Sequence, residues 1–448
     1  MYSKKVQNAL KNVRVGDFIT VDVEGKKYEG VLMPSTGLGD PDHIVIKTSS
    51  GYNIGLQHVP LMKITRIEKE FKRAKEESEI ELGKKKRINE IKFDVSKPKV
   101  SLITTGGTIT SRVDYETGGV TSLMKPDELL SNTPELAGII NVTDIVSPFT
   151  RMSESISFKD YDELGKCVEK ELNKTGASIV THGTDTLHYT AAALSFMFHS
   201  TRLPVVLTGA QRSSDRPSSD ASMNLVCAAH AAAYDFGEVG ICMHASSSDD
   251  SCFFMRGTKT RKMHTSRRDA FRPVNDVPFA RIFPDGKIEK ISEYRKKEEC
   301  EAKAFTGFEE KTALVKFAPN LSPEIIDFYA GKKYKGIVIE ATGLGQVALN
   351  TRDKKLSWLP SVKKAVDDGV AVCFAPQTLY GRLNPFVYAE ARKYHEVGAV
   401  FLEDMLPETA YVKLAWLLKN GKKDVPKLML QNYNGEISKR TLNESFLY

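Results

Sequence analysis

The chain has 448 residues, and its 64 Lys and Arg against 57 Asp and Glu give a formal net charge of +7. Hydrophobic residues make up 41% and charged residues 27%, a composition that excludes a disordered or collagen-like chain and is typical of folded globular proteins. The positive charge permits an anionic partner without establishing one. At roughly 150 residues per domain, the length predicts about three domains.

The spacing of the cysteines and the length of the apolar runs indicate the cellular compartment of the protein. The six cysteines lie far apart without a CxxC pair, which indicates neither a zinc site nor a disulfide framework and favours a reducing cytosol. The first residues lack the apolar stretch of a signal peptide. No apolar run approaches the ~18 to 20 residues that a membrane span needs. We therefore expect a cytoplasmic protein that makes no membrane contact.

The N-terminal region has a residue pattern that predicts short β-strands. Segments 15–34 and 43–56 alternate apolar and polar residues, and Glu24-Gly25 and Ser50-Gly51 mark tight turns. This pattern predicts a small, SH3-like β-barrel over residues 1–70.

A run dense in both charges follows over residues 68–92 and predicts a solvated helix or linker, assigned to 71–97. A nucleic-acid contact at Lys84–Arg87 is the weaker alternative.

Beyond the linker, buried-looking strands alternate with amphipathic helices, which predicts an α/β fold with largely parallel sheets. The expected strands are 100–105, 177–182, 204–209, 239–244, 335–341 and 370–376. A second charged stretch near 286–305 indicates another boundary. We expect a larger domain at 98–290, a linker at 291–310 and a smaller domain at 311–448.

Two strand-terminal loops carry the most informative motifs, because ligands of open α/β sheets bind beyond the carboxyl ends of the strands. One expected strand leads into TGGTI (105–109) and another into THGTDT (181–186). Taken singly, each motif is also explained by a glycine turn or a helix cap. Taken together, they are far more specific.

The two motifs resemble the signatures of the type I L-asparaginase family, and the resemblance extends from Pro98 to the C-terminus. It implies a two-domain asparaginase-like fold and a downstream lysine. RGTKTRK (256–262) offers Lys259 and Lys262, and the spacing to Asp269-Ala270-Phe271 favours Lys262. The resemblance implies a four-residue catalytic set: Thr108, Thr184, Asp185 and Lys262.

The resemblance also implies substrate contacts from Gly107, Tyr115, Ser153, Glu154 and Gly183. Tyr115 would close over the substrate as a lid. Glu154 departs from the amide that is common in the family.

Other polar groups near these loops have weaker roles. Asp215 or Asp220 in the loop 209–220 could bind the substrate's amino group. We interpret His182 as structural rather than as a general base, and no histidine spacing indicates a metal.

The four catalytic candidates are of the residue types that hydrolysis of an amide requires. A threonine hydroxyl attacks only when a neighbouring base takes its proton. A lysine serves as that base when burial or nearby charge lowers its pKa, and an aspartate can orient it. In our interpretation Thr108 attacks, the other three groups form a relay, and main-chain N–H groups stabilise the oxyanion. The residues alone leave open which threonine attacks.

Within the family, the chain resembles the glutaminase subunits of archaeal glutamyl-tRNA(Gln) amidotransferases in its N-terminal extension and in the segments 13–21 and 261–275. That resemblance implies an amidotransferase, a carbon–nitrogen ligase with glutamine as amido donor, that converts misacylated Glu-tRNA(Gln) to Gln-tRNA(Gln). This chain would hydrolyse glutamine without a cofactor. Its partner, the E subunit of the amidotransferase, would use ATP and Mg²⁺. A homodimer and an α2β2 assembly are implied.

Two alternative functions are also consistent with the sequence. One is a free cytosolic L-asparaginase with an accessory domain. The other is a non-catalytic scaffold or RNA-binding protein on the same fold.

Overall fold

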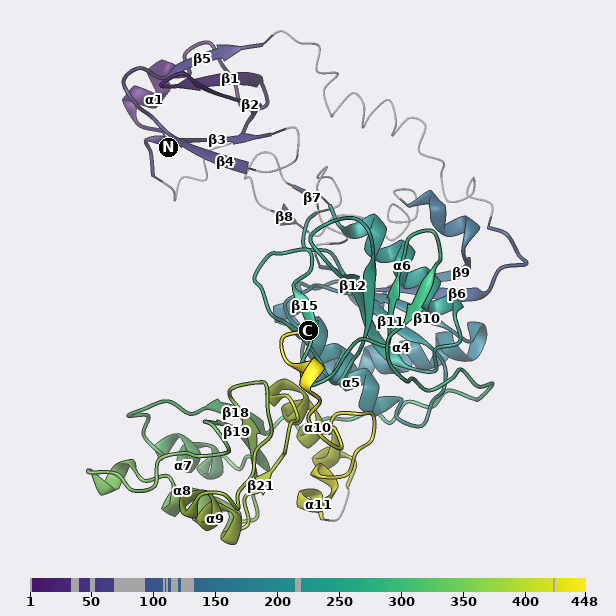
Figure 1. The fold of residues 1–448 in the computed structure, drawn as a ribbon, viewed down its shortest axis with the longest axis vertical. Helices are drawn as coiled ribbons and strands as arrows, with labels where there is room; N and C mark the ends of the chain where they lie inside the picture. The colour runs from purple at the N-terminus through teal and green to yellow at the C-terminus, as the bar shows by residue number, and fades with distance from the viewer. Residues whose placement is uncertain are drawn as a thin grey trace.

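The computed structural model describes residues 2–33, 40–48, 53–67, 93–107, 109, 112–113, 120–121, 133–213, 219–421 and 424–448. The described residues form an N-terminal sheet, a larger α/β domain and a smaller α/β domain, which follow one another along the longest axis (Figure 1). Most of the charged run expected at 71–97 lies outside the described residues.

The N-terminal part is a five-stranded antiparallel sheet with strand order β4-β3-β2-β1-β5. Its elements are α1 (Lys4–Ala9), β1 (Phe18–Val23), β2 (Lys26–Leu32), β3 (His43–Lys47), β4 (Asn53–Gln57) and β5 (Lys63–Arg66). The turn predicted at Glu24-Gly25 is confirmed, and its two residues have the positive φ of tight hairpin turns, 53° and 85°. No pairing between described residues joins β4 to β5, so closure into a barrel stays a prediction.

An eight-stranded sheet with order β17-β16-β13-β12-β11-β10-β6-β9 runs through the larger domain. Its strands are β6 (Lys99–Thr104), β9 (Asn141–Val146), β10 (Ser178–Thr181), β11 (Val205–Thr208), β12 (Val239–His244), β13 (Cys252–Arg256), β16 (Ala280–Ile282) and β17 (Ile288–Lys290). The pairings from β9 to β12 are parallel and the remaining ones antiparallel. The four strands predicted here are confirmed as β6, β10, β11 and β12.

Helices and two small hairpins complete this domain. The helices are η3 (Pro134–Gly138), η4 (Ser153–Ser155), α4 (Phe158–Thr175), α5 (Leu187–Met197) and α6 (Ala221–Ala233). The hairpins pair β7 (Arg112–Val113) with β8 (Val120–Thr121) and β14 (Thr260–Lys262) with β15 (Phe271–Pro273).

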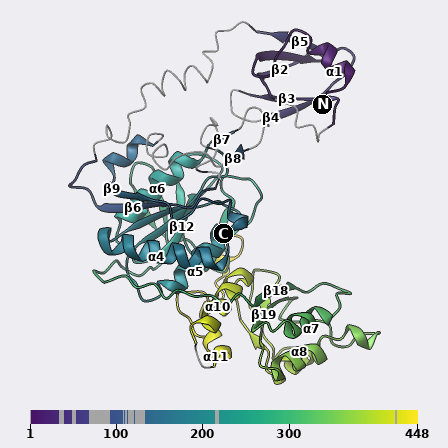
Figure 2. The same cartoon turned by 180° about the vertical axis from the view of Figure 1, so that it is seen from behind.

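Helices cover both faces of this sheet: α6 lies on one face, and α4 with α5 on the other (Figure 1, and from behind in Figure 2). On β10, Val180 packs with α4 and α5, whereas the preceding Ile179 packs with α6. Consecutive side chains of a strand point to opposite faces, so a strand covered on both faces is apolar throughout. This burial explains why the central strands were recognisable as continuous apolar runs.

The smaller domain holds a four-stranded parallel sheet with order β18-β19-β20-β21. Its strands are β18 (Thr312–Lys316), β19 (Gly336–Ala341), β20 (Ala371–Pro376) and β21 (Val400–Phe401). Its helices are α7 (Glu324–Gly331), η5 (Lys354–Leu356), α8 (Leu359–Asp367), α9 (Ala389–Glu396), α10 (Pro407–Lys419), α11 (Val425–Met429) and η6 (Asn443–Ser445). The two strands predicted for this region are confirmed as β19 and β20.

The two α/β domains share a core where α5 and α10 pack together. Phe196 on α5 stacks on Trp416 on α10, with ring centroids 5.8 Å apart, and α10 also packs on β18 and β19. The segment 291–310 is tied to α4, because Asn173 Nδ2 donates to the Ala302 carbonyl at 3.0 Å. These contacts fix the smaller domain against the larger one.

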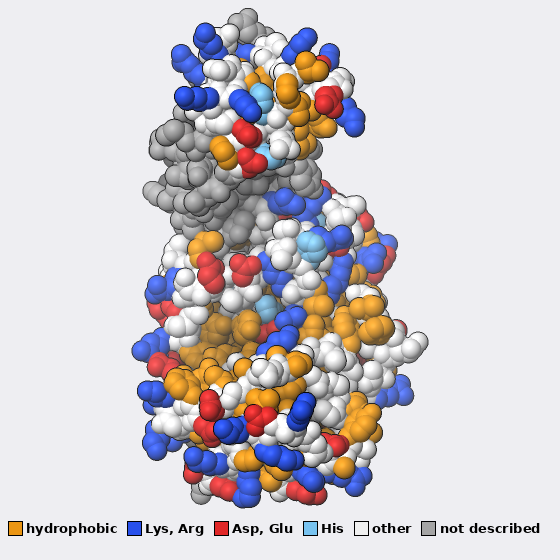
Figure 3. Space-filling model, turned by 90° about the vertical axis from the view of Figure 1, so that its left-hand side faces the viewer, with side chains coloured by type: hydrophobic (Ala, Val, Ile, Leu, Met, Phe, Trp, Pro, Cys, Tyr) orange, Lys and Arg blue, Asp and Glu red, His pale blue; other side chains and the backbone are white. Residues whose placement is uncertain are grey.

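One face of the molecule shows how its side chains are distributed. Lys and Arg side chains, interleaved with Asp and Glu, lie on the N-terminal part and on the smaller domain, and hydrophobic side chains gather between the two α/β domains (Figure 3). No helix among the described residues is long and apolar enough to cross a membrane.

Candidate active site

The two glycine-containing loops lie side by side. β6 and β10 are adjacent parallel strands with Thr104 paired to Thr181, so the loops leave the sheet at the same edge. A Cβ atom on Gly107 would lie 2.3 Å from the Cα atom of Gly183, and Gly107 has a φ of 84°. Only glycine combines this backbone conformation with so close an approach. Gly107 and Gly183, both expected at the substrate, therefore touch each other.

Ser153 approaches the second loop from η4. A Cβ atom on Gly183 would lie 2.9 Å from Ser153 Oγ, and Thr186 Oγ1 donates to the Ser153 carbonyl at 2.7 Å. Ser153 is buried, whereas the neighbouring Glu154 is exposed. The structure thus brings Ser153 to the loops and leaves the Glu154 side chain in contact with solvent.

Thr184, Asp185 and Lys262 meet through their side chains. Lys262 Nζ donates to Thr184 Oγ1 at 3.0 Å and to Asp185 Oδ1 at 2.7 Å. Thr184 is buried, the Lys262 side chain is 10% exposed and the Asp185 side chain is 65% exposed. The lysine therefore connects a buried hydroxyl with a carboxylate that faces solvent in this chain.

Lys259, the alternative lysine, lies at the junction of the two domains. Its Nζ donates to the Asp404 carbonyl at 3.0 Å and to Asp404 Oδ2 at 2.8 Å, and both side chains are fully buried. Arg261, which precedes Lys262 on β14, forms an ion pair with Glu408 of α10 at 2.7 Å. Neighbouring side chains of β14 thus face different partners, as expected in a strand. Of the two candidate lysines, Lys262 is the one that contacts Thr184 and Asp185.

His182 is held as a buried neutral ring. Its Nδ1 lies 2.7 Å from the Gly183 carbonyl and its Nε2 lies 2.9 Å from Thr190 Oγ1. Burial lowers the pKa of His182 to about 4, although the hydrogen bond with Gly183 acts in the opposite direction. Both ring nitrogens have protein partners, which supports the structural interpretation of this residue.

Asp220 holds the start of the loop that follows β11. Its carboxylate accepts hydrogen bonds from the N–H groups of Gln211 and Arg212 and from Asn224 Nδ2, each between 3.0 and 3.1 Å. Burial raises the pKa of Asp220, and those backbone hydrogen bonds act against that effect. Asp220 is fully buried, so these contacts give no support to a role in binding the substrate's amino group.

Three residues of the sequence analysis lie outside the described residues: Thr108, Tyr115 and Asp215. Their expected roles stay predictions. The two neighbours of Thr108, Gly107 and Ile109, are described and buried, and Ile109 packs in the core beneath α6.

A chain of polar side chains beside the site was not expected from the sequence. It runs from Asp220 through Asn224 to His244, and on to Asp249 and Arg268. The available signal was that the predicted strand 239–244 ends in His244, at the same sheet edge as the two glycine loops. Its contacts come from separate elements, which no local motif reveals.

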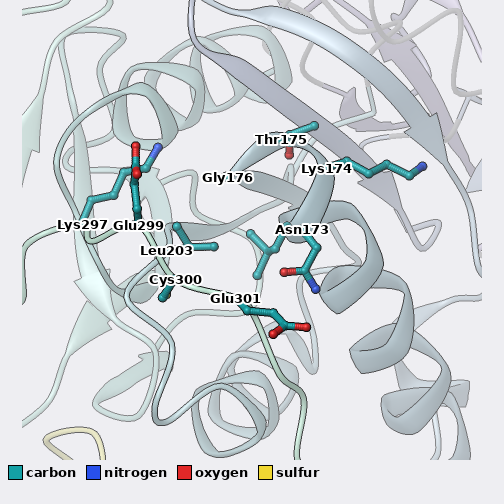
Figure 4. A pocket seen from close by; sticks show the side chains of 10 residues that line it. Asn173, Lys174, Thr175, Gly176, Leu203, Lys297, Glu299, Cys300 and Glu301 are labelled. Carbon is teal, nitrogen blue, oxygen red and sulfur yellow. The ribbon is translucent and has the colours of Figure 1, made fainter.

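A cavity of about 620 Å³ opens elsewhere on the larger domain, where the end of α4 faces the segment 297–301 (Figure 4). It is lined by Leu172, Asn173, Lys174, Thr175, Gly176, Leu203, Lys297, Glu299, Cys300 and Glu301. Gly176 and Leu203 precede β10 and β11, so this cavity lies at the sheet edge opposite to the site. Within the described parts of the chain, no cluster of three His, Cys, Asp or Glu side chains could hold a metal ion.

The fold and the juxtaposed loops define an asparaginase-type α/β protein with an additional N-terminal domain. Family comparisons match "Asparaginase, N-terminal" over residues 99–296, "Glutaminase/Asparaginase C-terminal domain" over 311–429 and "GatD N-terminal domain" over 13–67. The thermostable L-asparaginase from Thermococcus kodakarensis has a similar structure, with a TM-score of 0.66 and 28% identity over 76% of this chain and 100% of that one.

Relatives that match this chain along nearly its full length identify the family more specifically. The D subunit of the glutamyl-tRNA(Gln) amidotransferase of Pyrococcus furiosus is 46% identical over 445 residues, which cover 98% of each chain. The Methanopyrus kandleri protein of the same name is 45% identical over 97% of this chain and 94% of its own. The chain belongs to the family of glutamyl-tRNA(Gln) amidotransferase D subunits.

Proposed function

We propose that this chain is the glutaminase component of a tRNA-dependent amidotransferase, with Thr108 as nucleophile and Thr184, Asp185 and Lys262 as the proton relay. The observation that carries the proposal is the contact of Lys262 Nζ with both Thr184 Oγ1 and Asp185 Oδ1, at 3.0 and 2.7 Å, beside the Gly107–Gly183 contact. The family membership supplies the substrate class, glutamine.

The chemistry proceeds in two halves. Thr108 Oγ attacks the carboxamide carbon of glutamine and loses its proton to the relay. Main-chain N–H groups of the loops around Gly107 and Gly183 stabilise the oxyanion. The relay returns the proton to the leaving nitrogen, so that ammonia departs and an acyl-enzyme remains. Water, deprotonated by the same relay, then releases glutamate and restores the hydroxyl.

Attack by Thr184 is the competing assignment, because its hydroxyl contacts Lys262 directly. Acid quenching during turnover, followed by mass spectrometry of proteolytic peptides, locates the acyl group. We expect it on the peptide that contains Thr108, and its appearance on the Thr184 peptide would reverse the two roles.

The ammonia would pass to the partner, the E subunit of the amidotransferase, which activates the γ-carboxylate of tRNA-bound glutamate with ATP and Mg²⁺. We propose a homodimer of this chain in an α2β2 complex that binds Glu-tRNA(Gln). The test is amidation of Glu-tRNA(Gln) by the complex with glutamine as the only nitrogen source, with and without this chain. Amidation that proceeds equally well without this chain contradicts the proposal.

A free L-asparaginase is the second candidate, favoured by the structural likeness to L-asparaginases over 76% of the chain. The match of residues 13–67 to the GatD N-terminal domain favours the amidotransferase instead. Turnover of glutamine and asparagine by the isolated chain and by the complex separates the two. Full asparaginase activity without a partner, together with no effect on amidation, would support the second candidate.

A further inference from the structure

A chain of hydrogen bonds links the two sides of the candidate site through His244, the last residue of β12. Its Nδ1 lies 2.5 Å from Asn224 Oδ1 on α6, and its Nε2 lies 3.0 Å from Asp249 Oδ1. Arg268 donates to the same Asp249 oxygen at 2.7 Å. His244 is fully buried, so these groups are its hydrogen-bonding environment among the described residues.

The orientation of the Asn224 amide is fixed by its other contacts. Its Nδ2 donates to the Gly209 carbonyl and to Asp220 Oδ2, each at 3.0 Å, and both of those atoms only accept. The oxygen Oδ1 therefore faces His244. Because an amide oxygen cannot donate, Nδ1 of His244 must carry a proton.

The other ring nitrogen faces a carboxylate. Partial burial acts to raise the pKa of Asp249, but the hydrogen bonds from His244 and Arg268 outweigh it, and the pKa lies below the usual range of a carboxyl group. The Asp249 carboxylate thus joins His244 to Arg268 through a single oxygen, Oδ1.

The two ends of this series of hydrogen bonds lie next to the proposed catalytic residues. Gly209, held by Asn224, packs against Thr184: a Cβ atom at Gly209 would lie 3.1 Å from Thr184 Cγ2. At the other end, Arg268 belongs to the turn between β14 and β15, which follows Lys262 directly. A displacement at His244 would therefore act on both Thr184 and Lys262.

We propose that His244 is a positioning residue that ties the loop after β11 to the β14–β15 turn and so holds Thr184 and Lys262 in reacting geometry. This inference rests on the proposed function for its activity readout. It does not rest on it for the hydrogen bond from Nδ1 to Asn224.

The charged and titratable groups around His244 come from several elements. Asp220 lies beyond Asn224 at the start of α6, and Asp249 and Arg268 come from the loops after β12 and β14. Cys252, paired with His244 across β12 and β13, donates to the same Asn224 oxygen at 3.4 Å.

Nuclear magnetic resonance of the full chain with ¹⁵N-labelled histidine tests the hydrogen bond from His244 Nδ1 to Asn224 Oδ1 directly. The chain has nine histidines, and the loss of one set of signals in His244→Asn assigns the residue. We expect a proton on Nδ1 of His244. A His244 ring with no proton on Nδ1 overturns the proposal whether or not the chain is a glutaminase.

Substitutions at Asp249 test the positioning role, because this side chain is 60% exposed and its removal leaves the core intact. In Asp249→Asn, the amide can still contact the ring and accept from Arg268. This variant should keep glutaminase activity. Asp249→Ala should lower kcat on the order of 10- to 100-fold with little change in KM, because a small misplacement of reacting groups slows the chemical step.

The matched control is His230→Gln on α6, a half-buried histidine whose Nε2 lies 3.2 Å from the Pro284 carbonyl. It should leave kcat unchanged. Equal kcat values for Asp249→Ala and the unaltered chain overturn the positioning role, and so does a loss in Asp249→Asn as large as that in Asp249→Ala. If the unaltered chain shows no glutaminase activity in its complex, the proposed function fails instead, and the resonance measurement still decides whether His244 Nδ1 bonds to Asn224.

Discussion

Lys262 Nζ and Thr184 Oγ1 lie 3.0 Å apart although 78 positions separate the two residues in the chain. The β14–β15 hairpin makes this contact possible, and the smaller domain anchors the start of that hairpin. The buried Lys259–Asp404 pair and the Arg261–Glu408 pair both reach across the domain junction. The position of Lys262 therefore depends on how the two α/β domains pack.

Thr108→Ala should abolish glutamine hydrolysis while amidation of Glu-tRNA(Gln) with added ammonium salt continues. The variant removes the proposed nucleophile and leaves intact the ATP-dependent chemistry that we propose for the partner. The two nitrogen sources are compared in one amidation assay of the complex. Retention of every glutamine-dependent activity would instead support a non-catalytic role for this chain.

Lys262→Ala and Lys259→Met should fail in different ways. Without Lys262 the proposed relay loses its base, so kcat for glutamine should fall about 10²- to 10⁴-fold with no change in the unfolding midpoint. Without Lys259, the buried Asp404 carboxylate loses the ammonium group that lies 2.8 Å away, and breaking a buried ion pair destabilises a protein by about 3–5 kcal/mol. Residual activity should then follow the folded fraction.

Denaturant unfolding and glutaminase kinetics, measured on both lysine variants, check this separation. Equal losses of kcat at equal folded fraction would show that the two lysines cannot be assigned separate roles.

The parts of this fold that the sequence predicts are those whose burial leaves a local pattern. β6, β10, β11 and β12 are covered on both faces and read as apolar runs, and α4 and α6 carry amphipathic or alanine-rich stretches. The antiparallel strands β13, β16 and β17 were not predicted, because β16 and β17 are only three residues long and owe their strand conformation to pairing.

The same distinction holds for the site. The glycines and threonines of the two loops were identified from local motifs, and Lys262 from a spacing. The contacts that hold them come from distant elements: Asn224 lies on α6, His244 ends β12 and Asp404 belongs to the smaller domain. Such contacts depend on tertiary packing, which a single sequence does not display.

Gly107→Ala should inactivate the glutaminase because the added Cβ atom would lie 2.3 Å from the Cα atom of Gly183 and because Gly107 has a φ of 84°. The two loops must separate, and we expect kcat to fall on the order of 100-fold. Gly138→Ala is the matched control, since a Cβ atom there has open space around it. Steady-state kinetics on both variants check this, and full activity of Gly107→Ala would contradict the close contact of the loops.

His182 should make the stability of the chain depend on pH. Burial lowers the pKa of His182 to about 4 in the folded chain, against an ordinary value of 6.5. The neutral ring is therefore favoured by folding, and this contribution to stability is fully present above pH 6.5. It is lost as the pH falls from 6.5 through 4, because the unfolded chain binds the proton first. A difference of this size corresponds to a contribution on the order of 3 kcal/mol.

His182→Asn removes the titrating group and keeps a donor for the Gly183 carbonyl. Its free energy of unfolding, measured by denaturant titration at several pH values, should fall less steeply than that of the unaltered chain between pH 6.5 and 4. The exposed His395 on α9 provides the control, and His395→Asn should follow the unaltered chain. Parallel curves for His182→Asn and the unaltered chain would mean that the His182 ring is already protonated in the fold, which its contact with the Gly183 carbonyl and Thr190 hydroxyl argues against.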